Sequence, residues 1–172
     1  MATHKTISGE SSNTSVAGQA EAESQLASFV EKFEPKYASL IRDCRKKLKK
    51  LLPSALELVY DNYNFLAIGY CSSKRASDCV VSIAAAANGV GLSFYHGVDL
   101  PDPGGILEGA GKQNRFIRIP DASRLGDADV IWLIASAADL GKTPLPRKGN
   151  GYLIIKSVSA KQRPRQRTAS AP

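Results

Sequence analysis

The sequence predicts an α+β domain, in which helices pack on a mostly antiparallel sheet of five or six strands. Two observations predict this class. Apolar residues recur at the three- and four-residue spacing of helices before residue 53, and later they gather in short runs rich in β-branched and aromatic residues. The connections between these runs are too short for parallel crossovers, so antiparallel pairing is expected.

Two helices are expected at the start of the domain. The first begins near residues 21–24, and Pro35 ends it and opens the next. The second covers residues 35–52 and has the clearest periodicity, with an apolar stripe on one side and cations on the other. Pro53 supplies its stop.

Five runs in the middle of the chain are expected to be strands: 56–60, 65–71, 79–85, 90–95 and 116–119. Residues 87–89 read as a hairpin turn. In the fourth run apolar residues alternate with small or polar ones, so Val90, Leu92 and Phe94 should face inward.

A third helix is expected over residues 127–140, with Asp127 and Asp129 in its first turn and Gly141 past its end. Ile131 and Trp132 fall outside its apolar stripe. This pattern predicts a helix that is covered on two sides.

Three parts are expected along the chain. Residues 1–20 are polar and aperiodic, which predicts a disordered leader before the domain of residues 21–145. Residues 146–172 read as a basic C-terminal extension, in which residues 152–158 could form one strand. Seven of the 23 basic residues lie in this extension without an acidic one, leaving 16 basic against 16 acidic residues elsewhere. The net charge of +7 is therefore expected on an extended tail outside a neutral domain.

Composition also excludes several classes of protein. The 172 residues are 43% hydrophobic and 23% charged, too apolar for a wholly disordered chain. No apolar run approaches the roughly 20 residues of a membrane helix, and no secretory signal opens the chain. A cytoplasmic location without membrane contact is expected. The cysteines, Cys44, Cys71 and Cys79, match neither a zinc knuckle nor a redox Cys-x-x-Cys pair, so buried, reduced thiols are expected.

Several short motifs, in this order along the chain, are similar to those of a known family. Residues 52–65 read LPSALELVYDNYNF, and the later matches are LPDP at 100–103, LEG at 107–109, GK at 111–112 and Arg115. In order and spacing they resemble the YdhG-like family of bacterial domains of unknown function, over about residues 26–140. The resemblance implies a small α+β domain with helices packed on an antiparallel sheet. Some members are described as frataxin-like iron chaperones, but that role needs acidic ligands and the exposed side of the second helix is basic, so iron binding is not expected.

The glycine-rich segment of residues 102–115 is the first candidate site. Asp102 could cap a single helical turn that ends at Gly109. Gly109 and Gly111 allow a loop of exposed amides that, beside Lys112 and Arg115, could hold an anion. A plain glycine turn with solvated cations is the other interpretation.

Nucleotide motifs do not fit this segment. Ile106 and Gln113 stand where a P-loop needs glycine and a hydroxyl residue, and Asn114 stands where a dinucleotide fingerprint needs its third glycine. No cofactor is therefore expected.

A second candidate lies at Tyr60 and Tyr63, whose amphipathic rings could line one wall of a pocket. The Asp and Asn residues between them suit an ordinary turn equally well. His96 is the one histidine inside the expected domain, and no placed nucleophile or carboxylate accompanies it. The residues Cys71, Asp78 and Cys79 are neighbours in sequence but do not make a metal-ligand pattern, so no metal is expected.

These observations favour a non-enzymatic module that binds a small anionic ligand or a protein partner. Its concave site is expected between the turn at residues 60–63 and the loop at residues 109–115. A nucleic-acid-associated protein is the alternative, with phosphate contacts from the C-terminal tail through Arg163, Arg165 and Arg167. The other interpretation of this tail is that it only increases solubility and binds no partner. An enzyme with His96 or Tyr63 as proton carrier ranks third, and the oligomeric state stays open.

Overall fold

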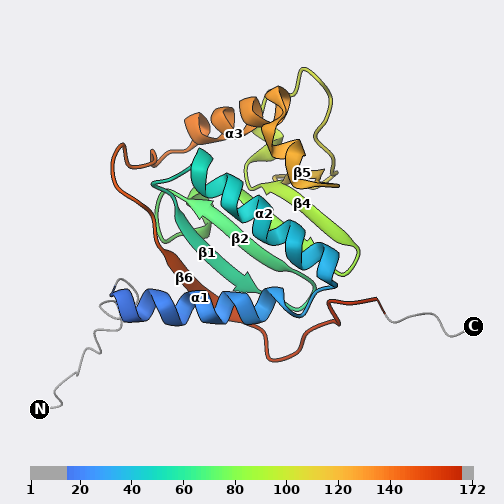
Figure 1. Cartoon of the computed structure of the whole chain (residues 1–172). Coiled ribbons are helices and arrows are strands. Elements are labelled where there is room, and N and C mark those ends of the chain that lie inside the picture. The colour runs from blue at the N-terminus through green and yellow to red at the C-terminus, as the bar shows by residue number, and fades with distance from the viewer. Residues whose placement is uncertain (1–14, 168–172) are drawn as a thin grey trace, which may run out of the picture.

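A six-stranded sheet in the order β5-β4-β3-β2-β1-β6 forms the centre of the computed structural model, which describes residues 15–167 (Figure 1). All neighbouring strands are antiparallel except β1 and β6, which are parallel. The predicted α+β class is confirmed. The α-helices are α1 (Val16–Val30), α2 (Pro35–Leu51) and α3 (Ala128–Leu140). The strands are β1 (Leu56–Asp61), β2 (Leu66–Cys71), β3 (Cys79–Ala86), β4 (Gly89–Phe94), β5 (Arg115–Arg118) and β6 (Leu153–Val158).

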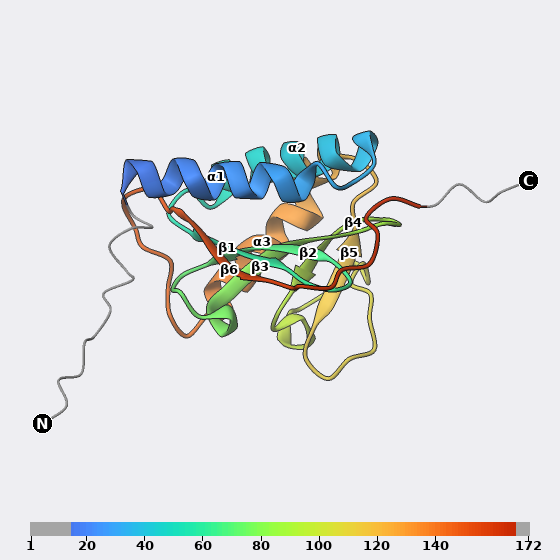
Figure 2. The same ribbon diagram turned by 90° about the horizontal axis from the view of Figure 1, so that it is seen from below.

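The sheet has two different faces. α1 and α2 lie across one of them, whereas neither covers the other (Figure 2). The side chains under the helices are large and apolar, and Val90, Leu92 and Phe94 are buried there as predicted. Gly91 and Ser93 alternate with these residues in β4 and lie on the opposite face, together with Ala84, the β3 partner of Gly91. Small residues of β3 and β4 therefore form this part of the face that has no α1 or α2.

α1 begins earlier than predicted. The Ser15 side chain accepts a hydrogen bond from the Gly18 N–H at 3.0 Å and caps the helix at Val16. The Gln19 side chain exchanges two hydrogen bonds with the backbone of Leu153 in β6, at 3.1 and 3.0 Å. Residues 16–20 are thus helical and tied to the sheet, and the predicted leader is wrong for them; its first 14 residues lie outside the described part. Polar contacts, which periodicity does not report, anchor this helical turn.

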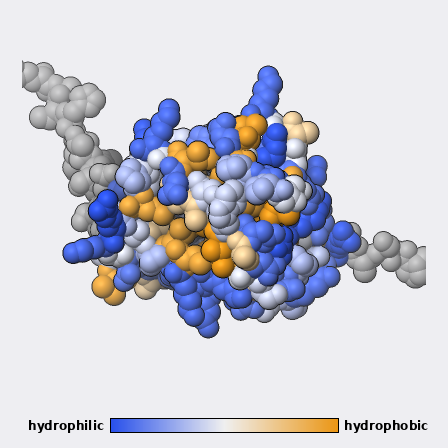
Figure 3. All heavy atoms as spheres, turned by 90° about the horizontal axis from the view of Figure 1, so that it is seen from above, coloured by the Kyte–Doolittle hydropathy of each residue, from blue (hydrophilic) through white to orange (hydrophobic). Residues whose placement is uncertain are grey.

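α3 packs across the end of the sheet where β3 begins, and Val130, Leu133 and Ile134 are buried. The prediction that it is covered on two sides is wrong, because Ile131 and Trp132 are 40% and 44% exposed. Figure 3 views the molecule from the side on which α3 lies and shows hydrophobic residues gathered at the surface.

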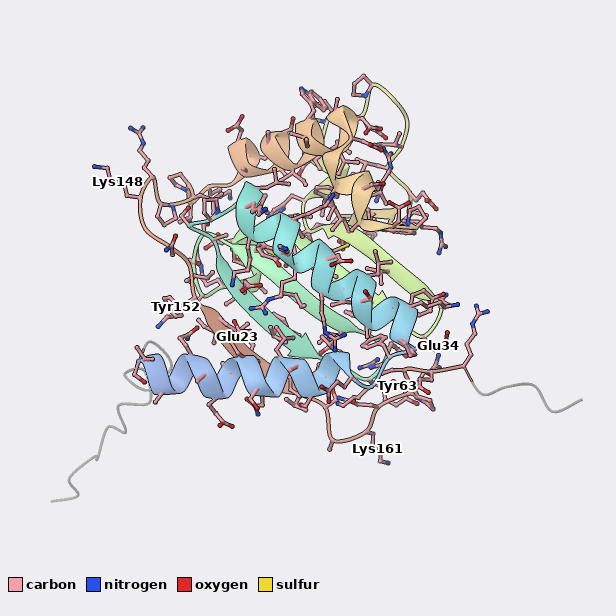
Figure 4. The ribbon with its side chains drawn as sticks, viewed as in Figure 1. Glu23, Glu34, Tyr63, Lys148, Tyr152 and Lys161 are labelled. Carbon is pink, nitrogen blue, oxygen red and sulfur yellow. The ribbon has the colours of Figure 1, made fainter. Side chains whose placement is uncertain are left out.

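The C-terminal residues are part of the fold. β6 pairs with β1, which confirms the strand predicted at 152–158. Beyond it, the Ser159 N–H donates to the Asp61 carbonyl and the Arg163 N–H to the Tyr63 carbonyl, both at 2.8 Å. Figure 4 shows this segment passing the turn that carries Tyr63. The predicted extended tail is therefore wrong through residue 167, and residues 168–172 lie outside the described part.

A buried ion pair fixes this segment. Arg165 and Asp61 are 3% and 0% exposed, and an Arg165 Nη2 lies 2.9 Å from an Asp61 carboxylate oxygen. Lys32 Nζ lies 2.7 Å from the other carboxylate oxygen. Because Lys32 belongs to the α1–α2 connection and Asp61 ends β1, the cluster joins three parts of the chain. It also explains why a basic segment packs on the domain, because the buried guanidinium of Arg165 pairs with the buried carboxylate of Asp61.

This cluster predicts a specific loss of stability in acid. Burial raises the pKa of Asp61, but hydrogen bonds, first from Lys32 and also from Arg165, offset burial and hold that pKa below its usual value. A carboxyl whose pKa is lowered by folding stabilises the fold above its unfolded pKa of about 3.9, and this contribution is lost as the pH falls through the folded pKa. Urea unfolding between about pH 5 and pH 2 should therefore show a steeper stability loss for the wild type than for Asp61→Asn. Equal pH dependence in the two proteins would contradict this assignment.

Candidate ligand-binding site

Asp102 has a structural role in the glycine-rich segment. Its carboxylate accepts hydrogen bonds from the backbone N–H groups of Ile106 and Leu107, at 3.0 and 2.9 Å. The predicted helical turn after Asp102 is wrong, because residues 103–104 form a turn and no helix forms over residues 103–109; the Asp102 carboxylate instead holds the backbone of this non-helical segment. Gly109 has φ of 117°, a conformation that favours glycine.

The side chain of Arg115 binds backbone groups of the loop that precedes β5. Arg115 Nη1 donates to the carbonyl oxygens of Gly111 and Asn114, at 2.5 and 2.8 Å. Lys112 is exposed, and its side chain makes no hydrogen bond or ion pair with another described residue. Since Arg115 is directed at carbonyl oxygens of this loop, the geometry gives the predicted anion site little support.

The two tyrosines have different surroundings. Tyr60 is half-buried beside the small cluster of Leu58, Cys71, Cys79 and Ile154. Tyr63 is 48% exposed in the β1–β2 turn, and the Arg163 guanidinium lies 5.6 Å from its ring centre. The Asn62 N–H donates to the Phe65 carbonyl at 3.0 Å, so the turn interpretation of this segment is confirmed. Tyr60 and Tyr63 therefore do not form one wall.

The topology separates the two predicted segments. Three strands lie between β1 and β5, so their backbones are roughly 19 Å apart at the usual strand spacing. Tyr60 and Tyr63 are thus not brought together with Lys112 and Arg115. The sequence neighbours of these residues do share a surface, however, because Phe65 and Asn114 line the same groove.

This groove, of about 290 Å³, lies on the sheet face that α1 and α2 leave uncovered. Phe65 and Phe116 supply its aromatic walls, and small residues of β3 and β4 form its floor. An added Cβ at Gly91 would lie 2.8 Å from the Ile117 carbonyl oxygen, so only glycine fits there without a backbone shift. The lining residues are Phe65, Ala84, Ala86, Asn88, Gly89, Val90, Gly91, Ser93, Asn114, Phe116 and Arg118.

Arg118 gives the groove its charge. Its guanidinium lies 5.9 Å from the Phe116 ring centre. The nearest carboxylate, that of Glu108, is 3.8 Å away, and both side chains of this pair are more than half exposed. Such an ion pair is weak, so Arg118 can bind an external anion. None of the described residues lining the groove is acidic.

Phe65, Phe116 and Arg118 were not predicted as site residues, because in the sequence they read as ordinary strand residues. The available signal was the alternation of alanine, glycine and serine with large apolar residues in β3 and β4. That pattern marks a sheet face that lacks large side chains, but it does not identify which aromatic residues border it.

His96 lies in a second cleft, of about 450 Å³, whose walls carry Arg75, Lys142, Asp78 and Asp99. Its Nε2 lies 3.0 Å from the Ser77 carbonyl oxygen and its Nδ1 lies 3.4 Å from Gln113 Nε2. Both ring nitrogens thus contact loop groups, so the imidazole holds two loops together. This arrangement gives a proton-carrier role little support.

Neither a metal-ligand cluster nor a membrane-spanning helix is present within residues 15–167. No three His, Cys, Asp or Glu side chains there come together as metal ligands. None of the helices in this range has the length and apolar character needed to cross a bilayer.

No known protein family, curated protein or solved structure matches this chain. The resemblance to the YdhG-like family stays a prediction.

Proposed function

We propose that this protein is a non-enzymatic binding module that holds a planar, anionic small molecule on the open face of its sheet. The groove between Phe65 and Phe116 is the observation that carries the proposal. Aromatic side chains beside a flat floor of small residues favour a planar ring, because stacking needs close approach over the whole ring. The side-chain amides of Asn88 and Asn114 can hydrogen-bond to the polar edge of such a ring.

The charge of the groove selects the class of ligand. Arg118 is the cation among its described lining residues, none of which is acidic, and its weak partner Glu108 is not one of them. A guanidinium binds phosphate or carboxylate through paired hydrogen bonds. The ligand should therefore place its ring between the phenylalanines and its anionic group at Arg118. The Gly109–Gly111 loop is not needed in this arrangement.

Calorimetric titration with adenosine monophosphate, adenosine and inorganic phosphate tests whether the ligand ring stacks on Phe116. Phe116→Ala should weaken adenosine monophosphate and adenosine alike by about tenfold, within the 1–3 kcal/mol that one stacked base contributes. The affinity for inorganic phosphate, which has no ring, should be the same in wild type and Phe116→Ala. If all three probes bind wild type and Phe116→Ala equally, or none binds the wild type, the proposed groove is not the site.

The same three probes test whether the charge of Arg118 contributes to binding. Arg118→Ala should weaken adenosine monophosphate by about fivefold, roughly 1 kcal/mol for an exposed ion pair, and leave adenosine unchanged. Arg42→Ala is the matched control, since Arg42 is an exposed cation of α2, on the helical side of the molecule. Equal effects of the two substitutions would show that net charge, and not Arg118, determines binding.

Nucleic-acid binding by the C-terminal arginines is the second candidate. Arg163 and Arg167 are exposed, and Arg163 stacks with Tyr63, which gives a cation and a ring on one surface. Arg165 cannot contribute, because it is buried against Asp61. A salt-sensitive gel shift of a single-stranded oligonucleotide that is lost in Arg163→Ala/Arg167→Ala and kept in Phe116→Ala would favour this candidate.

A further inference from the structure

Two of the three cysteines face each other across neighbouring strands. Cys71 ends β2, Cys79 begins β3, and the two are partners of the antiparallel pair directly after an irregularity that shifts its register between Tyr70 and Cys71. Cα atoms of such partners lie about 4.5–5.5 Å apart, inside the range of about 4.4–6.8 Å that disulfides span. Both cysteines are reduced in the structure. The strand register thus places them where a disulfide fits.

Gly69 makes room for both sulfur atoms. An added Cβ at Gly69 would lie 2.8 Å from Cys79 Sγ and 3.4 Å from Cys71 Sγ. Both sulfurs therefore point to the same small space over β2, so the side chains as well as the backbone are directed for bond formation. Any side chain larger than that of glycine would compete for this space.

Cys79 differs from the other two cysteines in the acidity of its thiol and in its exposure. A hydrogen bond from the Cys71 thiol, with further help from the Ser82 hydroxyl at 3.2 Å, lowers the pKa of Cys79. The same interaction raises the pKa of Cys71. Burial raises the pKa of Cys44 to about 11. Cys79 is also the most accessible of the three, at 9% exposed against 1% for Cys71 and 0% for Cys44.

We propose that Cys71 and Cys79 are a reversible redox pair that a hydroperoxide converts to an intramolecular disulfide. The Cys79 thiolate attacks the peroxide, the O–O bond breaks, and the departing oxygen takes a proton and leaves as alcohol or water. The Cys71 sulfur then displaces the hydroxyl group from the Cys79 sulfenic acid, and water leaves with the Cys71 proton. The sulfurs lose two electrons, the peroxide gains them, and a thiol reductant restores the pair.

The disulfide would close the base of the segment that joins β2 to β3. Arg75, Ser77 and Asp78 of this segment line the cleft that contains His96. Lys156 Nζ already holds it to β6 through the Lys74 carbonyl, at 3.1 Å. Oxidation therefore restrains one wall of that cleft, away from the groove proposed for ligand binding.

Peptide mapping of the folded full-length chain after peroxide treatment and thiol blocking tests the pair. Trypsin cuts after Lys74 and Arg75, so a disulfide must link the peptides 51–74 and 76–112 in the non-reduced digest. Cys44, in the peptide 43–45, should stay reduced. The linked peptide should disappear with a reductant, and the oxidised chain should melt several degrees higher because a closed loop restricts the unfolded chain.

Cysteine variants assign the roles. Cys44→Ser should form the link as the wild type does. Cys71→Ser should stop at a sulfenic acid on Cys79 that dimedone traps, whereas Cys79→Ser should react with peroxide at least tenfold more slowly, roughly the change expected on loss of the activated thiol. If the link forms only in denaturant, or if Cys44 is oxidised as fast as Cys79, the proposal is overturned.

Discussion

Replacing Asp61 by alanine is expected to lower the free energy of unfolding by about 3–5 kcal/mol, because it leaves a buried guanidinium without its counter-ion. Of its hydrogen-bond partners Arg165 would keep only the Asn62 carbonyl, which its Nη2 contacts at 2.5 Å. The Phe33 ring, whose centre lies 5.7 Å from the guanidinium, carries no full charge. Its Nε and Nη1 already lack a hydrogen-bond partner. Urea unfolding followed by circular dichroism measures the loss.

Two further variants show that the cost belongs to the ion pair. Arg167→Ala removes an exposed arginine two residues further on and should change the free energy of unfolding by less than about 0.5 kcal/mol. Asp61→Ala/Arg165→Met removes both buried charges and should cost less than the two single changes added together. An Asp61→Ala protein as stable as Arg167→Ala would mean that the C-terminal segment does not pack on the domain.

Gly151→Ala is expected to destabilise the protein by about 3 kcal/mol or more, at the upper end for overpacking, because the new Cβ has no space. It would lie 1.6 Å from the Ala55 carbonyl oxygen and 2.3 Å from the Ala55 carbonyl carbon. These backbone atoms directly precede β1, and Gly151 precedes β6, so the chain entering β6 must move away from β1. The same backbone contact includes the Gly151 N–H, which donates to the Pro53 carbonyl at 2.9 Å.

Gly126→Ala is the matched control for this prediction. An added Cβ at Gly126 meets no atom within 4 Å, and its φ is not positive. Thermal unfolding should therefore place Gly126→Ala close to the wild type and Gly151→Ala well below both. A Gly151→Ala protein that melts with the wild type would contradict the close packing of the chain entering β6 on β1.

Local patterns predicted most of the fold. α2 and the strands were predictable because their periodicity records which side faces the core. The C-terminal segment was not, because its basic residues resemble a solvated tail until Arg165 is known to meet Asp61 on a distant strand. The start of α1 was missed for a related reason: Ser15 and Gln19 act through polar contacts, one of them to β6.

The candidate site was predictable only as the neighbourhood of two regions of the chain. Of the predicted residues 60–63 and 109–115, only Asn114 lines the groove, and Phe65 and Phe116 lie just outside those ranges. Which side chain of a strand faces a groove depends on register, and which strands adjoin depends on strand order. Neither follows from composition, so the ring-binding residues could not be chosen from the sequence.

Nuclear magnetic resonance titration of the ¹⁵N-labelled chain with adenosine monophosphate tests the central claim most directly. The account predicts that amide shifts concentrate on the groove, at Ala84, Gly91, Ser93, Asn114 and Phe116. Shifts that concentrate instead around His96 or the loop of residues 109–112, or their absence at saturating ligand, would contradict it.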